Sequence, residues 1–115
     1  MKVYDRKKIA RGLLVYVRDK HSYRDIHLSR ASVADYLNVP PKILSEVLRD
    51  EMNTNFNDFV NLYRVRYVNH LLSNPSTAGK TLDDISIMSG FSCRMTMHRA
   101  YLKVYGCSPR QLLKL

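Results

Sequence analysis

The sequence predicts an all-helical fold of about seven helices, in which one long helix joins two helix-turn-helix units. Apolar residues recur at helical spacing through most of the 115 residues. Twice, two short helical stretches flank a tight turn, at residues 38–40 and at Gly90. We expect a first unit at residues 1–54, a linker helix of about 28 Å at residues 55–73, and a second unit at residues 74–115.

The second unit has the clearest pattern. Its first expected helix carries an apolar stripe formed by Leu82, Ile85, Ile87 and Met88. Gly90 ends this helix, and Phe91 supplies a large apolar anchor. The next expected helix has an inner face formed by Met97, Tyr101 and Tyr105.

Two further signals bound the helices of this unit. Gly106 stops the second helix, and Ser108 and Pro109 begin a third, with Ser108 as the cap and Pro109 at the first helical position. A helix, a tight glycine turn and a second helix form a helix-turn-helix, whose second helix typically lies in the DNA major groove.

The first unit begins with an expected amphipathic helix at residues 5–21, followed by a polar loop at residues 22–27. The apolar stripe of this helix consists of Ile9, Leu13, Tyr16 and Val17. Ser29 is a plausible cap for the next helix, and Pro41 suits the first turn of the one after it. The expected buried residues of these two helices are Val33, Ala34, Leu37, Leu44, Val47 and Leu48.

The second unit also resembles a known family in the order and spacing of its motifs. These motifs are Ile85-Ser86, Gly90-Phe91, Met97-x-Arg99-x-Tyr101 and Gly106-x-Ser108-Pro109. Together they resemble the second half of the AraC/XylS-type DNA-binding domain. The linker residues Arg64-Val65, Val68 and Leu71-Leu72 are similar to that family's linker helix. The chain departs from the family pattern at Ser86, Cys93 and Leu102, where Ala, a capping Asp or Ser, and Lys are usual.

The resemblance implies a homeodomain-like fold, promoter binding and contact with RNA polymerase, usually as an activator. Family members often carry a sensor domain ahead of this domain. We therefore expect either a small regulator or the DNA-binding part of a longer protein.

The net charge of +9 suits a polyanionic partner such as nucleic acid. The basic excess lies at the two ends of the chain, whereas residues 28–54 carry three basic and four acidic side chains. No apolar run approaches the roughly 18 residues that span a bilayer, and the N-terminus has no signal-peptide pattern. We expect a cytoplasmic protein, and we expect no membrane contact by this segment.

The outward face of the second recognition helix holds the strongest DNA-binding candidates. Arginine can donate a bidentate pair to guanine, which discriminates by about 1–3 kcal/mol, and a methyl group can contact thymine. The candidates are Arg94, Met95, Thr96, His98 and Arg99. The resemblance implies that Arg94, Met95, His98 and Arg99 face bases. The alternative is an ordinary solvated helix face.

The equivalent positions of the first recognition helix are Lys42, Ser45, Glu46 and Arg49. Glu46 can accept a hydrogen bond from cytosine N4, but a carboxylate also repels phosphate. An alternative is that Glu46 pairs with Arg49 or Lys42 along its own helix. We expect this unit to contribute less DNA affinity than the second.

Other reactive side chains point to structure rather than chemistry. Arg64 is expected to serve packing more than phosphate binding. Cys93 and Cys107 are expected as free thiols inside the helical core, without metal spacing. The four histidines show no ligand spacing, and no catalytic triad or phosphate loop is visible. We therefore expect neither a cofactor nor a metal, and not an enzyme.

These patterns predict sequence-specific binding of double-stranded DNA and regulation of transcription. The two recognition helices would enter successive major grooves, because the linker length is close to one DNA turn of about 34 Å. Three alternatives stay open. They are an architectural DNA binder without sequence preference, a helical module for protein or membrane surfaces, and an alkylation-repair regulator with a reactive cysteine centre.

Overall fold

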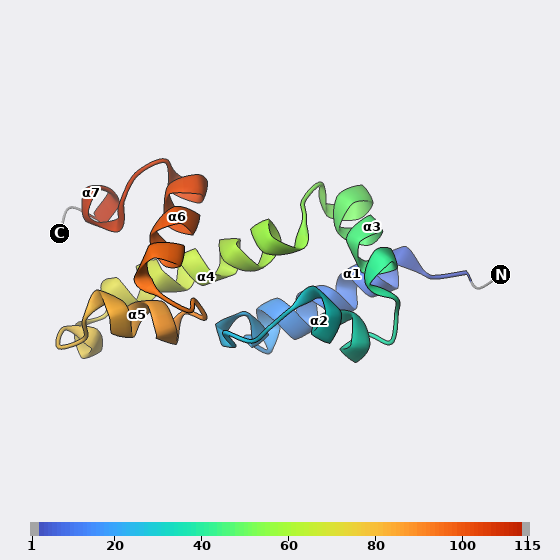
Figure 1. Ribbon diagram of the computed structural model, residues 1–115, viewed down its shortest axis with the longest axis horizontal. Helices are drawn as coiled ribbons and strands as arrows, with labels where there is room; N and C mark the ends of the chain where they lie inside the picture. The colour runs from blue at the N-terminus through green and yellow to red at the C-terminus, as the bar shows by residue number, and fades with distance from the viewer. Residues whose placement is uncertain (1–2, 114–115) are drawn as a thin grey trace. The chain divides into compact units, whose positions relative to one another are not determined.

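The computed structural model describes residues 3–113, and this range contains seven α-helices and no strand. The helices are α1 Arg6–Leu13, α2 Arg30–Tyr36, α3 Pro41–Met52, α4 Phe56–Leu72, α5 Leu82–Met88, α6 Arg94–Tyr105 and α7 Pro109–Leu113 (Figure 1). A π-helical segment, Leu14–Asp19, continues α1, and short 3-10 segments lie at Ser22–Arg24 and Pro75–Thr77. The predicted all-helical fold of about seven helices is confirmed.

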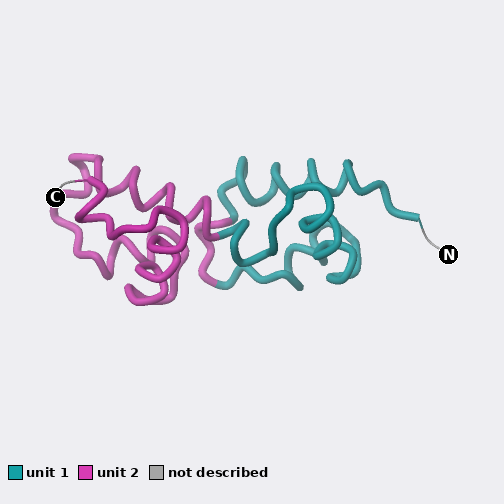
Figure 2. The backbone as a smooth tube through the Cα atoms, turned by 90° about the horizontal axis from the view of Figure 1, so that it is seen from above, with its two compact units in different colours: residues 1–22, 27–60 teal, residues 23–26, 61–115 magenta. Residues whose placement is uncertain are grey.

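The chain folds into two compact units, coloured separately in Figure 2. Unit 1 consists of residues 1–22 and 27–60, and unit 2 of residues 23–26 and 61–115. The first residues of α4 therefore belong to unit 1 and the remainder to unit 2. The expected division into helix-turn-helix subdomains, with boundaries at residues 54 and 74, stays a prediction.

The core of unit 1 follows the predicted apolar stripes. Its buried side chains are Ile9, Leu13, Val17, Val33, Ala34, Leu44, Val47 and Leu48, together with Phe59 and Val60 from the start of α4. Helix α3 packs against both α1 and α2. Local signals fix the helix starts, because Ser29 and Ser32 form a reciprocal capping box on α2 and Pro41 occupies the first position of α3. Asn53 ends α3 in the left-handed conformation, with φ of 52°.

The core of unit 2 is built around Phe91 and Tyr101, which are almost completely buried. It also contains Val65, Val68, Leu71, Ile85, Met97 and Ala100. The Tyr101 hydroxyl donates a hydrogen bond to Asn69 Oδ1 on α4 at 2.5 Å, so its polar atom is satisfied. Burial raises the pKa of the Tyr101 phenol.

The predicted apolar stripe of α5 is wrong for three of its four residues. Ile85 is buried, but Leu82, Ile87 and Met88 are exposed, and the buried neighbours of Ile85 are Ser86 and Ser89. Helix α5 packs against α6. The Ser86 hydroxyl donates to the Asp83 carbonyl at 2.8 Å, so this buried group is paired within its own helix.

Arg64 ties the segment at residues 23–26 to unit 2. Its Nε donates to the Tyr23 carbonyl at 2.6 Å, and its NH2 donates to the Asp25 carbonyl at 2.8 Å. The guanidinium also lies 5.7 Å from the centre of the Phe91 ring. Burial lowers the pKa of Arg64. Arg64 therefore has the predicted structural role, while Tyr23 is buried in a segment that was expected to be a polar loop.

Candidate nucleic-acid interface

Helix α6 is held with one face inward and the other open to solvent. The turn before it contains Gly90, with φ of 97°, and Gly106 ends the helix with φ of 74°. Met97, Ala100 and Tyr101 bury the inner face. This spacing leaves the intervening positions of the helix on its outer side.

All five DNA-binding candidates of α6 lie on that outer side. Arg94, Met95, Thr96, His98 and Arg99 are each exposed, and Met95 retains 63% of its accessible surface. Arg99 NH2 lies 3.4 Å from Met95 Sδ. Arg94 and His98 form no hydrogen bond or ion pair with another described residue. Two cationic or ionisable groups of α6 are therefore available to a ligand without breaking an existing bond.

A groove with a volume of about 880 Å³ runs along the start of α6. Its wall is mainly apolar and includes basic side chains and one carboxylate, and the groove belongs entirely to unit 2. The lining residues are Leu82, Asp83, Cys93, Arg94, Met95, Met97, His98, Ser108, Pro109 and Arg110. Three of the five α6 candidates therefore line a concave surface.

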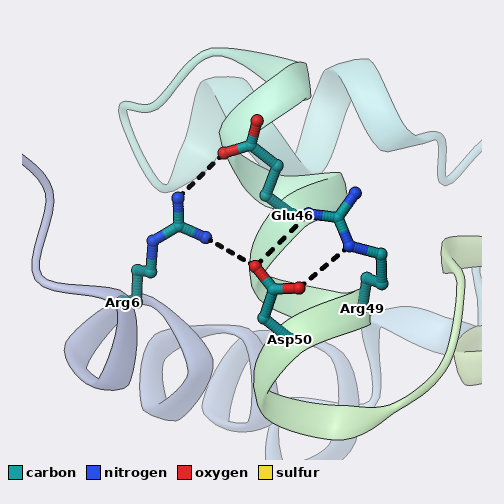
Figure 3. A network of polar contacts seen from close by, with 4 residues as sticks. All are labelled: Arg6, Glu46, Arg49 and Asp50. Carbon is teal, nitrogen blue, oxygen red and sulfur yellow. Dashed lines mark hydrogen bonds and ion pairs between the residues drawn. The ribbon is translucent and has the colours of Figure 1, made fainter.

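The polar face of α3 is arranged differently, because three of its four candidates are engaged within the protein. The Ser45 hydroxyl accepts a hydrogen bond from Arg30 NH1 at 2.8 Å. Glu46 Oε2 lies 2.9 Å from Arg6 NH2, and Arg49 Nε lies 2.9 Å from Asp50 Oδ1 (Figure 3). Lys42 is exposed and forms no hydrogen bond or ion pair with another described residue.

The family model described as a helix-turn-helix domain matches residues 33–115, more than half of the chain. This range begins within α2 and includes α3, the linker helix α4 and the whole second unit. The chain belongs to the AraC-type helix-turn-helix family. No curated protein matches it in sequence.

Solved structures show the same AraC-type fold. The C-terminal domain of AraT, a response regulator from Geobacillus stearothermophilus, is 25% identical with a TM-score of 0.77, over 92% of this chain and 83% of that chain. A transcriptional regulator with an AraC-type DNA-binding domain from Chromobacterium violaceum is 19% identical with a TM-score of 0.70, over 89% of each chain. The DNA-binding domain of the global transcriptional factor AdpA, solved with a target DNA, is 13% identical with a TM-score of 0.74, over 90% of this chain and 87% of that chain.

The ion pairs of α3 in this AraC-type domain correct the expected partner of Glu46. Glu46 was expected to pair, if at all, with Lys42 or Arg49 on its own helix. Its partner is instead Arg6 of α1, and Arg49 pairs with Asp50. No sequence signal points to Arg6 as the partner, because 40 residues separate it from Glu46 and nothing in helical periodicity relates them.

The charges in this network stabilise one another. The hydrogen bond from Arg49 lowers the pKa of Asp50, and the same bond raises the pKa of Arg49. Two carboxylates and two guanidinium groups therefore face each other, and the acidic character that the sequence suggested for α3 is locally balanced.

The two cysteines of the AraC-type domain do not lie inside the core. Cys93 is exposed at the N-cap of α6, and Cys107 is partly buried. The Cys93 side chain makes no capping hydrogen bond to the helix backbone, but its Sγ lies 3.3 Å from Thr96 Oγ1. That hydrogen bond lowers the pKa of the Cys93 thiol. Their placement in the core was therefore predicted wrongly.

Within residues 3–113, no group of three or more His, Cys, Asp or Glu side chains is arranged to hold a metal ion. None of the helices described there combines the length and the apolar character required to cross a membrane.

Proposed function

We propose that this chain binds double-stranded DNA with sequence specificity and regulates transcription. Membership of the AraC-type helix-turn-helix family carries this proposal, and the open polar face of α6 supplies suitable chemistry. In this role α6 enters one major groove and α3 enters the next. The continuous 17-residue α4 supports the proposal, because a helix of that length spans about 26 Å and one turn of DNA rises about 34 Å.

On α6, the proposed base-reading residues are Arg94, Met95, Thr96, His98 and Arg99. A free guanidinium such as that of Arg94 can donate two hydrogen bonds to guanine O6 and N7. Met95 offers a large exposed apolar surface to a thymine methyl group. The imidazole of His98 has two ring nitrogens, one of which can donate a hydrogen bond to a base while the other can accept one.

On α3, the proposed residues Lys42, Ser45, Glu46 and Arg49 contribute less affinity than those of α6. Three of the four already hold intramolecular partners, so a DNA contact must replace existing hydrogen bonds. A replaced bond adds less net free energy than a new one, because the gain is offset by the bond that is lost. Arg99→Ala should therefore weaken binding more than Arg49→Ala.

One experiment tests the main proposal. Duplexes selected from a random pool at physiological salt should yield a motif in two parts, separated by one helical turn. The selected duplex should bind at least about 10³-fold more tightly than random duplex. Equal affinity for both would indicate an architectural binder, and no binding at about 50 mM salt would indicate a protein-interaction module.

The family also suggests finer properties that we propose here. The chain contacts RNA polymerase at promoters, acts as an activator, and works in the cytoplasm together with a sensor domain. It performs no catalysis of its own and needs no cofactor. Transcription from a promoter that carries the selected motif, measured with purified polymerase, tests the first two properties.

A further inference from the structure

Arg6 holds two carboxylates of α3 with one guanidinium. Its NH2 donates to Glu46 Oε2 at 2.9 Å, and its NH1 donates to Asp50 Oδ2 at 3.1 Å (Figure 3). Glu46 and Asp50 are four residues apart, so they lie one above the other on the same face of α3. A planar guanidinium with fixed donors can bridge such a pair, whereas an ammonium group provides only a point charge.

Asp50 is itself anchored from the opposite side. Arg49 donates to both of its carboxylate oxygens, from Nε at 2.9 Å and from NH2 at 3.3 Å. Asp50 therefore accepts hydrogen bonds from two arginines, while Glu46 accepts its bond from Arg6 (Figure 3). The chain of contacts therefore links Glu46, through the Arg6 guanidinium, to Asp50 and Arg49.

One carboxylate oxygen of Glu46 stays unused. Oε2 is bonded to Arg6, but Oε1 has no hydrogen-bond partner among the described residues. The polar side-chain atoms that are both buried and unpaired in this range are Arg24 Nε and Ser89 Oγ, so Glu46 Oε1 retains some exposure to solvent. The side chain as a whole retains 22% of its exposure. Glu46 is thus a largely buried carboxylate with one accessible acceptor.

We propose that Arg6 is a positioning residue for base recognition, holding Glu46 so that Oε1 accepts a hydrogen bond from cytosine N4. This inference rests on the proposed function, in which α3 enters a major groove. Carboxylates are the side chains that accept from cytosine N4. A free glutamate near phosphates is repelled and samples many rotamers, and Arg6 offsets both effects by pairing its charge and fixing its side chain.

The test compares base preferences of variants of the whole chain. The motif selected by the wild type is varied one base pair at a time, and the Glu46→Ala variant identifies the cytosine whose preference depends on Glu46. Arg6→Met and Arg6→Lys are then measured on the same duplexes, together with the Arg6→Met/Glu46→Ala double variant. Arg18→Met serves as the matched control, because it removes one positive charge from the same N-terminal segment and Arg18 forms an ion pair with Asp19.

The wild type should prefer cytosine at that position by about tenfold or more, the scale of one good base contact. Glu46→Ala, Arg6→Met and Arg6→Lys should each reduce this preference to about twofold or less. The double variant should lose no more of the cytosine preference than Glu46→Ala loses alone. Arg6→Lys retains the charge, so its affinity for duplexes that lack this cytosine should resemble that of the wild type. Arg18→Met should lower affinity for all duplexes alike and keep the cytosine preference.

Different results separate the two proposals. If Arg6→Lys and Arg6→Met keep the preference, or if Glu46→Ala removes none, Arg6 does not act through Glu46 and the inference is overturned. If the wild type selects no motif at all, the proposed function fails first. Circular dichroism of each variant shows whether it is folded. If Arg6→Met does not fold, the base preference of Arg6→Lys alone tests the inference.

Discussion

Gly90→Ala should be among the most damaging single-methyl additions in unit 2. A Cβ built on Gly90 would lie 2.3 Å from the Tyr23 carbonyl oxygen and 2.8 Å from Arg64 Nε. These are the two atoms that share the 2.6 Å hydrogen bond fixing residues 23–26 to α4. The added methyl group must therefore disrupt the hydrogen bond that holds residues 23–26 to α4. One of the two obstructing atoms, the Tyr23 oxygen, belongs to the backbone and cannot simply rotate away.

Two contributions set the magnitude. Placing a side chain at φ of 97° costs about 1–2 kcal/mol. Disrupting a hydrogen bond from a charged donor costs about 1.5–3 kcal/mol. The free energy of unfolding should therefore fall by about 3–5 kcal/mol, a large part of the 5–15 kcal/mol that is usual for a domain, and Tm should fall by about 10–20 °C.

Two other glycines separate these contributions. Gly106 also has a positive φ, of 74°, but a Cβ there would meet no atom within 4 Å, so Gly106→Ala should cost about 1–2 kcal/mol. Gly79 has neither a positive φ nor a close neighbour, and Gly79→Ala should change stability by less than about 1 kcal/mol. Urea unfolding followed by far-ultraviolet circular dichroism measures all three, since the chain contains no tryptophan. Equal losses for Gly90→Ala and Gly106→Ala would refute the role of the close contact.

Four further outcomes are expected. Cys93→Ser should raise the free energy of unfolding in urea by about 1 kcal/mol, because the serine hydroxyl can cap α6 and the Cys93 side chain does not. Ser89→Ala should raise it by about 1 kcal/mol in the same assay, since the Ser89 hydroxyl is buried without a partner. Hydrogen bonds with Thr81 lower the pKa of Asp84. The stability that this contributes is present above about pH 4 and should be lost as the pH falls through the lowered pKa. Asp84→Asn should weaken this pH dependence of stability in acid titrations. A thiol reagent should modify Cys93 before Cys107, by mass spectrometry of short reactions, and the adduct should weaken DNA binding; equal rates at both thiols would contradict this order.

The sequence alone determined the helices and their ends. Helical periodicity located the buried stripes of α1, α3 and α6. Short-range signals located helix boundaries: Ser29 the start of α2, Pro41 the start of α3 and Gly106 the end of α6. These features depend on residues within about one or two turns of each other, which a sequence displays directly. The same periodicity placed the five exposed candidates of α6 on one face.

Only the tertiary structure decided which distant groups meet. It turned Leu82 and Met88 outward and buried Ser86, because the inner face of α5 depends on its packing against α6. It paired Glu46 with Arg6 rather than with Lys42 or Arg49, and it joined Arg64 to the backbone of residues 23–26. Such partners are far apart in sequence, and their pairing depends on how whole helices pack, which local patterns of apolar and polar residues do not encode.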